Sequence, residues 1–288
     1  MGVENWPITI QGVAAAAPRL PVSFQEGWSV NLSELDGQGS LARQAVKERA
    51  ASVRRLPSHT ISDLLIPTSY AIDLAEGRSL GHAQRVAYIA ASIAGVLEVD
   101  NALRLACCYA GLLHDIGVIA AGSGLSQFVR GDERLVFASL PLLTPEAAAL
   151  GASDIQGIVV DRLIDHTIQG ARSAQELALP PDAIKGIASH HENWNGGGYP
   201  YGLDGRDIPI VGRVVALADQ VESMISHATS LQARRNLPSW LKTLSGNVAD
   251  PEVVQAFRVL SGRDTFWLGF FSSNLASELA ALCALQRE

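Results

Sequence analysis

The stretch DNALRLACCYAGLLHDIG at residues 100–117 decides the fold. Asp100 can cap a helix over residues 102–115 that is apolar nearly all round. A helix without a polar face must be buried, so this segment predicts the centre of the core. It ends on the doublet His114-Asp115, whose side chains a core seldom accommodates without a partner.

Helical periodicity continues on both sides of this segment. Ser79 is expected to cap a helix whose apolar face carries residues at spacings of three and four, namely His82, Val86, Ile89, Ile93 and Leu97. Further helices are expected at residues 40–55 and 62–76, from about Pro145 to Leu179, and after the prolines at 180–181 and 209. We expect Pro67 to kink or shorten the second of these. The pattern predicts an all-α protein.

Composition and charge exclude several classes of protein. With 288 residues, of which 48% are hydrophobic and 18% charged, the chain can fill one large domain or two small ones and is not disordered throughout. Its 29 acidic and 22 basic residues give a net charge of −7, which argues against binding a nucleic-acid polymer through bulk electrostatics.

The setting predicted from the sequence is the cytoplasm, with no membrane attachment. We find no uninterrupted apolar run of about 18 residues, and Glu4 stands where a secretion signal would be basic. Cys107 and Cys108 lie in the apolar segment, which suits buried thiols in a reducing compartment better than a disulfide framework.

Polar residues recur on or at the ends of several apolar helices. One histidine in such a place is usually structural, but here five histidines and two aspartates share it: His82, His114, Asp115, His166, His190, His191 and Asp219. Burying an ionised group away from water costs roughly several kcal/mol unless the group is paired or bound to a metal. Lysine occurs only at 47, 185 and 242, so few ammonium groups are present to neutralise the two aspartates. A metal cation is therefore the favoured partner.

The donor set predicts the kind of metal. Five nitrogen ligands and two carboxylates suit Fe or Mn, with Zn or Ni as alternatives, better than the all-oxygen preference of Mg or Ca. Seven side chains exceed what one ion takes with a position left open. Two divalent transition metals are therefore predicted.

A family resemblance follows from these residues and their spacing. The chain resembles the HD superfamily of metal-dependent phosphohydrolases, and its HD-GYP subgroup in particular, over about residues 79–262. The segments that carry the likeness are HHENWNGGGYP at 190–200, GLDGRDIP at 202–209, RVVALAD at 213–219 and DPEVVQAF at 250–257.

The resemblance implies an HD-domain helical bundle with extra N- and C-terminal helices. It implies that the seven polar residues are metal ligands, with Asp115 bridging two ions and His114 and Asp115 at the catalytic centre. The implied reaction is hydrolysis of cyclic di-GMP or a related cyclic dinucleotide. The loop with Gly198 and Tyr199 is implied to shape the substrate pocket or to present a surface to a partner, although a turn that only stops the helix explains it equally well. Arg78 is a candidate phosphate clamp.

The chain also departs from the family pattern. Val118 stands where a phosphate-facing Lys is usual, and AlaThrSerLeu at 228–231 where an arginine-bearing segment is common. Fifty residues separate Asp115 from His166, about twenty more than usual. A degenerate module that binds metal or a signalling partner without turnover is thus the second hypothesis. A di-iron oxygenase is a third, against which the GlyTyrPro signature argues.

Three regions are predicted: an arm and helix of unknown role at 1–60, the metal-binding helical domain at 61–262, and a C-terminal segment at 263–288. That last segment holds Phe266, Trp267, Phe270 and Phe271, which either cover the bundle as a lid or form a homodimer surface. Glu192 is a candidate acceptor that holds the tautomer of an imidazole.

Overall fold

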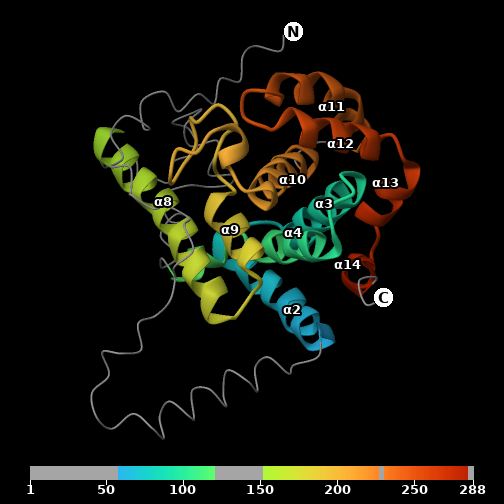
Figure 1. The fold of residues 1–288 in the computed structure, drawn as a ribbon, viewed down its shortest axis with the longest axis horizontal. Coiled ribbons are helices and arrows are strands. Elements are labelled where there is room, and N and C mark those ends of the chain that lie inside the picture. Colours follow the sequence, from blue (N-terminus) through green and yellow to red (C-terminus); the bar gives the residue numbers. More distant parts are fainter. Residues whose placement is uncertain (1–57, 121–151, 227–229, 285–288) are drawn as a thin grey trace, which may run out of the picture.

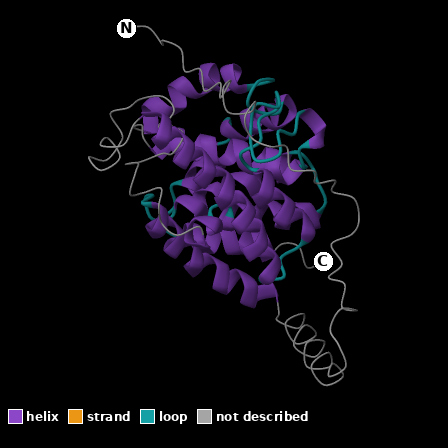
Figure 2. Cartoon of the chain, turned by 90° about the vertical axis from the view of Figure 1, so that its left-hand side faces the viewer, coloured by secondary structure: helices purple, strands orange, loops and turns teal. Residues whose placement is uncertain are grey.

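The computed structural model describes residues 58–120, 152–226 and 230–284. Within these ranges the chain is helical and has no β-strand, as Figure 2 shows, which confirms the predicted all-α class. The helices are α2 (Ser58–Glu76), α3 (His82–Val96), α4 (Asn101–Leu113), α5 (Ile116–Ala120), α8 (Ala152–Glu176), α9 (Pro181–Ser189), α10 (Ile210–Ser226), α11 (Ser230–Leu244), α12 (Pro251–Ser261), α13 (Asp264–Phe270) and α14 (Leu275–Ala284).

Helices α3 and α4 lie at the centre of the bundle (Figure 1). Every residue of α4 from Ala106 to Leu113 is buried, and α3 buries most of its length. Helices α9 and α10 pack on this pair, while α2 lies below it and α8 at the left of the view in Figure 1. The most apolar segment of the sequence therefore forms the core, as its composition predicts.

The segment that contains α4 corrects one expectation. Residues Asn101–Ile119 are long and apolar enough to span a membrane by length and composition, contrary to the prediction that no such segment exists. In the folded chain 67% of this window is buried against other helices, so it is accounted for as a core segment. Asp100 caps its helix as predicted, accepting a hydrogen bond of 2.8 Å from the Leu103 backbone N–H.

The start of α3 differs from the prediction. Ser79 does not cap this helix; the residue before it is Gly81, with φ of 83° in the left-handed region that favours glycine. The cap comes from α2, where the buried Asp73 carboxylate accepts from the backbone N–H groups of Gly81 at 2.7 Å and Ala83 at 3.0 Å. A carboxylate from a neighbouring helix thereby fixes the turn that presents His82.

Helix α2 runs through Pro67 without ending there, so of the two expected effects the shortening is wrong, and the kink stays a prediction. At the other end of the chain, Phe266, Trp267 and Phe270 are buried and belong to the main core, which agrees with a lid. Phe271 remains 53% exposed. The expected helix at 40–55 and most of the long interval before His166 lie outside the described residues.

The two adjacent cysteines differ from each other. Cys107 is a free buried thiol, as predicted, and burial raises its pKa to about 12. Cys108 is disulfide-bonded, so the expectation of a second thiol is wrong. Neighbouring residues on a helix point about 100° apart, which lets the two sulfur atoms face different surroundings.

Candidate metal centre

The fold brings together all seven residues predicted as ligands, and each of them is buried. They come from different helices: the start of α3, the junction of α4 and α5, the middle of α8, the end of α9 and the middle of α10. Their donor atoms form two groups, which we call the four-residue pocket (Asp115, His166, His190, His191) and the three-residue pocket (His82, His114, Asp115). Asp219 adjoins the second, with its Oδ1 3.6 Å from His82 Nε2.

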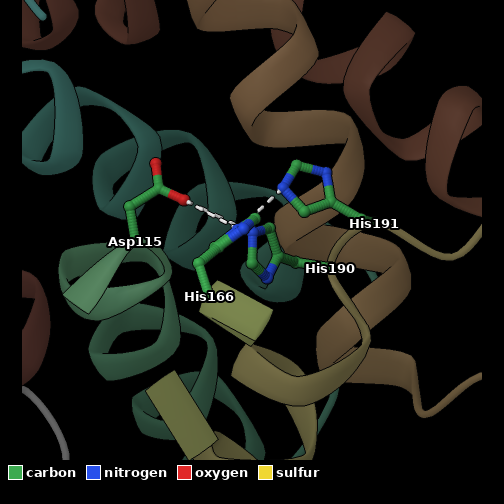
Figure 3. A group of neighbouring side chains, drawn as sticks. All are labelled: Asp115, His166, His190 and His191. Carbon is green, nitrogen blue, oxygen red and sulfur yellow. Dashed lines mark hydrogen bonds and ion pairs between the residues drawn. The ribbon is translucent and has the colours of Figure 1, made fainter. Parts of the chain in front are cut away.

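Asp115 belongs to both pockets. Its Oδ1 lies 3.6 Å from His166 Nε2 and 3.5 Å from His190 Nε2, while its Oδ2 lies 2.8 Å from His114 Nε2. Figure 3 shows the carboxylate facing the four-residue pocket, in which His166 Nε2 and His191 Nε2 are 3.1 Å apart. A carboxylate in this position can bridge two ions.

Backbone carbonyls orient two of the imidazoles. His114 Nδ1 is 2.9 Å from the Gly111 carbonyl, and His190 Nδ1 is 2.7 Å from the Ile187 carbonyl. A carbonyl can only accept, so Nδ1–H is the donor in each case. Each ring therefore turns Nε2 to the site, the nitrogen that can ligate a metal when it carries no proton.

Burial and neighbouring charges together set the pKa values of the residues in the cluster. Burial lowers the pKa of His82 and of His190, so both are neutral near pH 7. Burial alone would raise the pKa of Asp115, but the imidazoles of His114 and His190 outweigh it and hold that pKa well below its usual range. Burial would likewise lower the pKa of His114, yet the Asp115 carboxylate raises it to about 8. A bound cation can take the place of that proton.

Several donor atoms at the centre are buried without a hydrogen-bond partner. Among the described residues these include His82 Nε2, Asp115 Oδ1 and His190 Nε2. A buried polar atom left unsatisfied costs about 1–3 kcal/mol, so a cluster of them requires compensation. Nitrogen and carboxylate donors converging in this way fit divalent transition metals.

Two glycines allow α5 and α8 to approach closely beside the centre. A Cβ on Gly117 would lie 1.8 Å from the backbone oxygen of His166 and 2.5 Å from the backbone nitrogen of Gly170. No side chain fits there, so the absence of a Cβ at Gly117 is what lets α8 bring His166 against Asp115.

The three residues predicted to contact substrate have separate surroundings. Arg78 lies beside the three-residue pocket, where its charge contributes to the lowered pKa of His82; its Nε is 3.0 Å from Glu76 Oε1. Tyr199 stacks on His191, with ring centroids 4.8 Å apart. A Cβ on Gly198 would lie 2.2 Å from the backbone nitrogen of Asn193, so close backbone packing accounts for glycine there. Substrate contact by all three stays a prediction.

Two carboxylates beside the centre were missed or misassigned. Glu222, which sequence reasoning missed, lies 2.6 Å from His82 Nδ1. Its signal was its place three residues after Asp219, on the same face of α10. Glu192 does not hold an imidazole, contrary to expectation: its oxygens accept from the backbone N–H groups of Tyr201 at 2.7 Å and Leu203 at 3.0 Å. It fixes the loop instead.

Comparison with known proteins agrees with this architecture. The sequence matches the HD domain family over residues 80–224. It is 29% identical over 180 residues to a cyclic di-GMP phosphodiesterase of Thermotoga maritima, covering 61% of this chain and 43% of that protein. It is 26% identical over 223 residues to a cyclic di-GMP phosphodiesterase of Pseudomonas aeruginosa, covering 75% and 46%. The chain thus spans less than half the length of these relatives.

A solved structure of a cyclic GMP-AMP-specific phosphodiesterase from Vibrio cholerae superposes with a TM-score of 0.60 at 23% identity. The likeness covers 77% of this chain and 53% of that one, and at this identity it speaks to the fold alone. Helix α2 precedes the residues matched to the family and α11 to α14 follow them. Of these, α13 and α14 lie in the C-terminal segment predicted at 263–288, and the N-terminal helix predicted at 40–55 lies outside the described residues.

Proposed function

The chain belongs to the HD domain family, in its HD-GYP subgroup, and from that premise we propose that it is a dinuclear metal-dependent phosphodiesterase acting on cyclic di-GMP or a related cyclic dinucleotide. The observation that carries the proposal is Asp115, whose carboxylate belongs to two buried groups of donor atoms. Relatives named as cyclic dinucleotide phosphodiesterases support the substrate class.

The ligands of the two metals are the residues of the two pockets together with Asp219. Two divalent ions of Fe or Mn, with Zn or Ni as alternatives, would stabilise negative charge on a phosphodiester and make water a nucleophile near neutral pH. Asp115 contributes its carboxylate to both pockets and so fixes their relative position. His114 and His190, fixed by backbone carbonyls, need no reorientation when the ions enter.

Other residues bind the substrate in this proposal. The positive charge of Arg78 beside His82 meets the phosphate. The loop with Gly198 and Tyr199 closes the pocket on the side of His191, where the tyrosine ring limits how the imidazole can turn. The site serves a small cyclic dinucleotide in the cytoplasm and no nucleic-acid polymer or membrane. The exposed Phe271 is the part of the aromatic segment left for a homodimer contact.

One observation favours a second function, a metal-binding module without turnover. Val118 is only 8% exposed, and it is an apolar residue where the family usually has a phosphate-facing Lys. Loss of such a cation removes electrostatic stabilisation of the transition state, worth a few kcal/mol by rough estimate.

Turnover assays on a defined metal content separate the two functions. Protein purified without oxygen is loaded with Fe²⁺ or Mn²⁺ and incubated with a panel of cyclic dinucleotides, and products are identified by chromatography and mass spectrometry. We expect conversion to a linear or mononucleotide product, lost in Asp115→Ala and kept in Lys185→Ala, whose ion pair with Asp182 lies at the surface. Full metal content with no conversion of any substrate would instead establish the binding module.

A further inference from the structure

Glu222 lies on α10 with 1% of its surface exposed, and three side chains donate to it. His82 Nδ1 lies 2.6 Å from its Oε2, while Arg85 Nε at 2.6 Å and Ser226 Oγ at 2.5 Å share its Oε1. Both carboxylate oxygens of Glu222 are therefore occupied, one by His82 and the other by Arg85 and Ser226.

Arg85 connects this carboxylate to the turn before α3. Its Nη2 donates to Ser79 Oγ at 2.8 Å and its Nη1 to the Leu80 carbonyl at 3.2 Å. The guanidinium is 19% exposed, whereas the carboxylate of Glu222 is 2% exposed. Arg85 thus joins the surface to the buried Glu222 carboxylate. It donates hydrogen bonds to Glu222, Ser79 and Leu80, none of which is a predicted ligand.

His82 depends on a side chain for its orientation, unlike His114 and His190, whose Nδ1 atoms face backbone carbonyls. A substitution can remove the partner of His82, whereas no substitution removes a carbonyl. His82 belongs to the three-residue pocket alone. Any effect on its orientation should therefore reach one pocket and spare the other.

We propose that Glu222 is a positioning residue that sets the affinity of the three-residue pocket alone, so that the two metals bind with different affinities and in a fixed order. The inference rests on the proposed dinuclear centre. With Asp219 each pocket offers four donors, so their number does not set the order; the four-residue pocket fills first because none of its histidines hydrogen-bonds to Glu222. The three-residue pocket fills second, and it relies on the Glu222 carboxylate to hold Nδ1 of His82, so that Nε2 faces inward.

The test is a titration of the metal-free chain with Mn²⁺ alone, followed by calorimetry and by elemental analysis after gel filtration. We expect two binding events in the wild type. In Glu222→Gln, the weaker event should lose about 10–100-fold in affinity while the tighter event stays unchanged, since loss of such a partner typically has that effect. Arg85→Ala should weaken the same event by a smaller factor.

Asp250→Asn is a matched control, because Asp250 is a buried carboxylate paired with an arginine, Arg213, but contacts no histidine in the described structure. It should leave both binding events unchanged even where it lowers the unfolding temperature. If Glu222→Gln fails to fold, Arg85→Ala decides, because it leaves every ligand and Glu222 in place. Equal weakening of both events, or of neither, would overturn the role of Glu222.

Failure of the centre itself would look different. A wild-type chain that binds no Mn²⁺, or one ion only, would contradict the dinuclear site and with it the order of loading. Two wild-type events that respond equally to Glu222→Gln would leave the centre intact and remove the positioning role.

Discussion

Replacing Gly117 by alanine should damage the metal centre from outside the ligand set. The added Cβ would lie 1.8 Å from the His166 carbonyl oxygen, whereas ordinary contacts begin at 3.4 Å. Helices α5 and α8 must then separate by about 1.5 Å, or one of them must rotate. Because α8 carries His166 and Asp115 precedes α5, the separation pulls the four-residue pocket apart.

The magnitude follows from the overlap. Overpacking of a well-filled interior costs about 1–3 kcal/mol. Gly117→Ala should lie at the upper end of this range, because the atoms that the new Cβ would meet are backbone atoms of α8 and cannot move aside as a side chain can. For a domain of this size the unfolding midpoint should fall by about 5–10 °C. A catalytic group displaced by about 1 Å can cost 10²-fold in rate, so turnover should fall further than stability does.

The assay compares Gly117→Ala with Gly262→Ala by thermal unfolding and by metal content after dialysis. Gly262 ends α12 at φ of −77°, and a Cβ there meets its nearest atom, the Val259 oxygen, at 3.5 Å. The control should unfold like the wild type and keep its metals, whereas Gly117→Ala should lose at least one. Wild-type stability and metal content in Gly117→Ala would refute the close approach of α5 and α8.

Three further outcomes are expected. Cys107, with its pKa raised to about 12 by burial, should resist iodoacetamide at pH 8 in the native protein and react once denatured, as read by mass spectrometry; rapid native labelling would contradict its burial. Burial raises the pKa of Glu192 from 4.5 to about 7, so the metal-free fold holds a proton that the unfolded chain releases, and stability should fall as pH rises from about 4.5 to 7. Measured by urea unfolding, the free energy of unfolding should fall over this pH range by up to about 3 kcal/mol more in the wild type than in Glu192→Gln. An equal fall in both proteins would refute the raised pKa of Glu192. Chelation should lower the thermal midpoint reversibly. The loss in free energy of unfolding should be about 3 kcal/mol, compared with protein in metal at about one hundred times the dissociation constant. An unchanged midpoint would argue against bound metal.

The buried cluster of candidate ligands could be predicted from the sequence because the chemistry of these residues conflicts with their surroundings. Imidazoles such as His166 and the carboxylate of Asp115 stand on helices whose other residues are apolar, and that conflict is visible without coordinates. Helical class followed from the same periodicity. The structure groups six of the seven residues into two pockets that share Asp115, with Asp219 beside His82.

What escaped prediction depends on contacts between helices that are distant in sequence. Asp73 caps α3 from α2, a role that Ser79 seemed to fill because it stands at the right distance along the chain. Glu222 is 140 positions from His82, and nothing local marks it as that residue's partner. Glu192 looked like an imidazole partner beside His191, yet the loop folds back and offers it backbone N–H groups instead.

The central claim is that Asp115 joins two metal pockets, and anomalous diffraction from crystals of the Mn²⁺-loaded chain tests it most directly. The account predicts two anomalous peaks, one beside His166, His190 and His191 and one beside His82 and His114, each within bonding distance of the Asp115 carboxylate. A single peak, or two peaks of which only one touches Asp115, would contradict it.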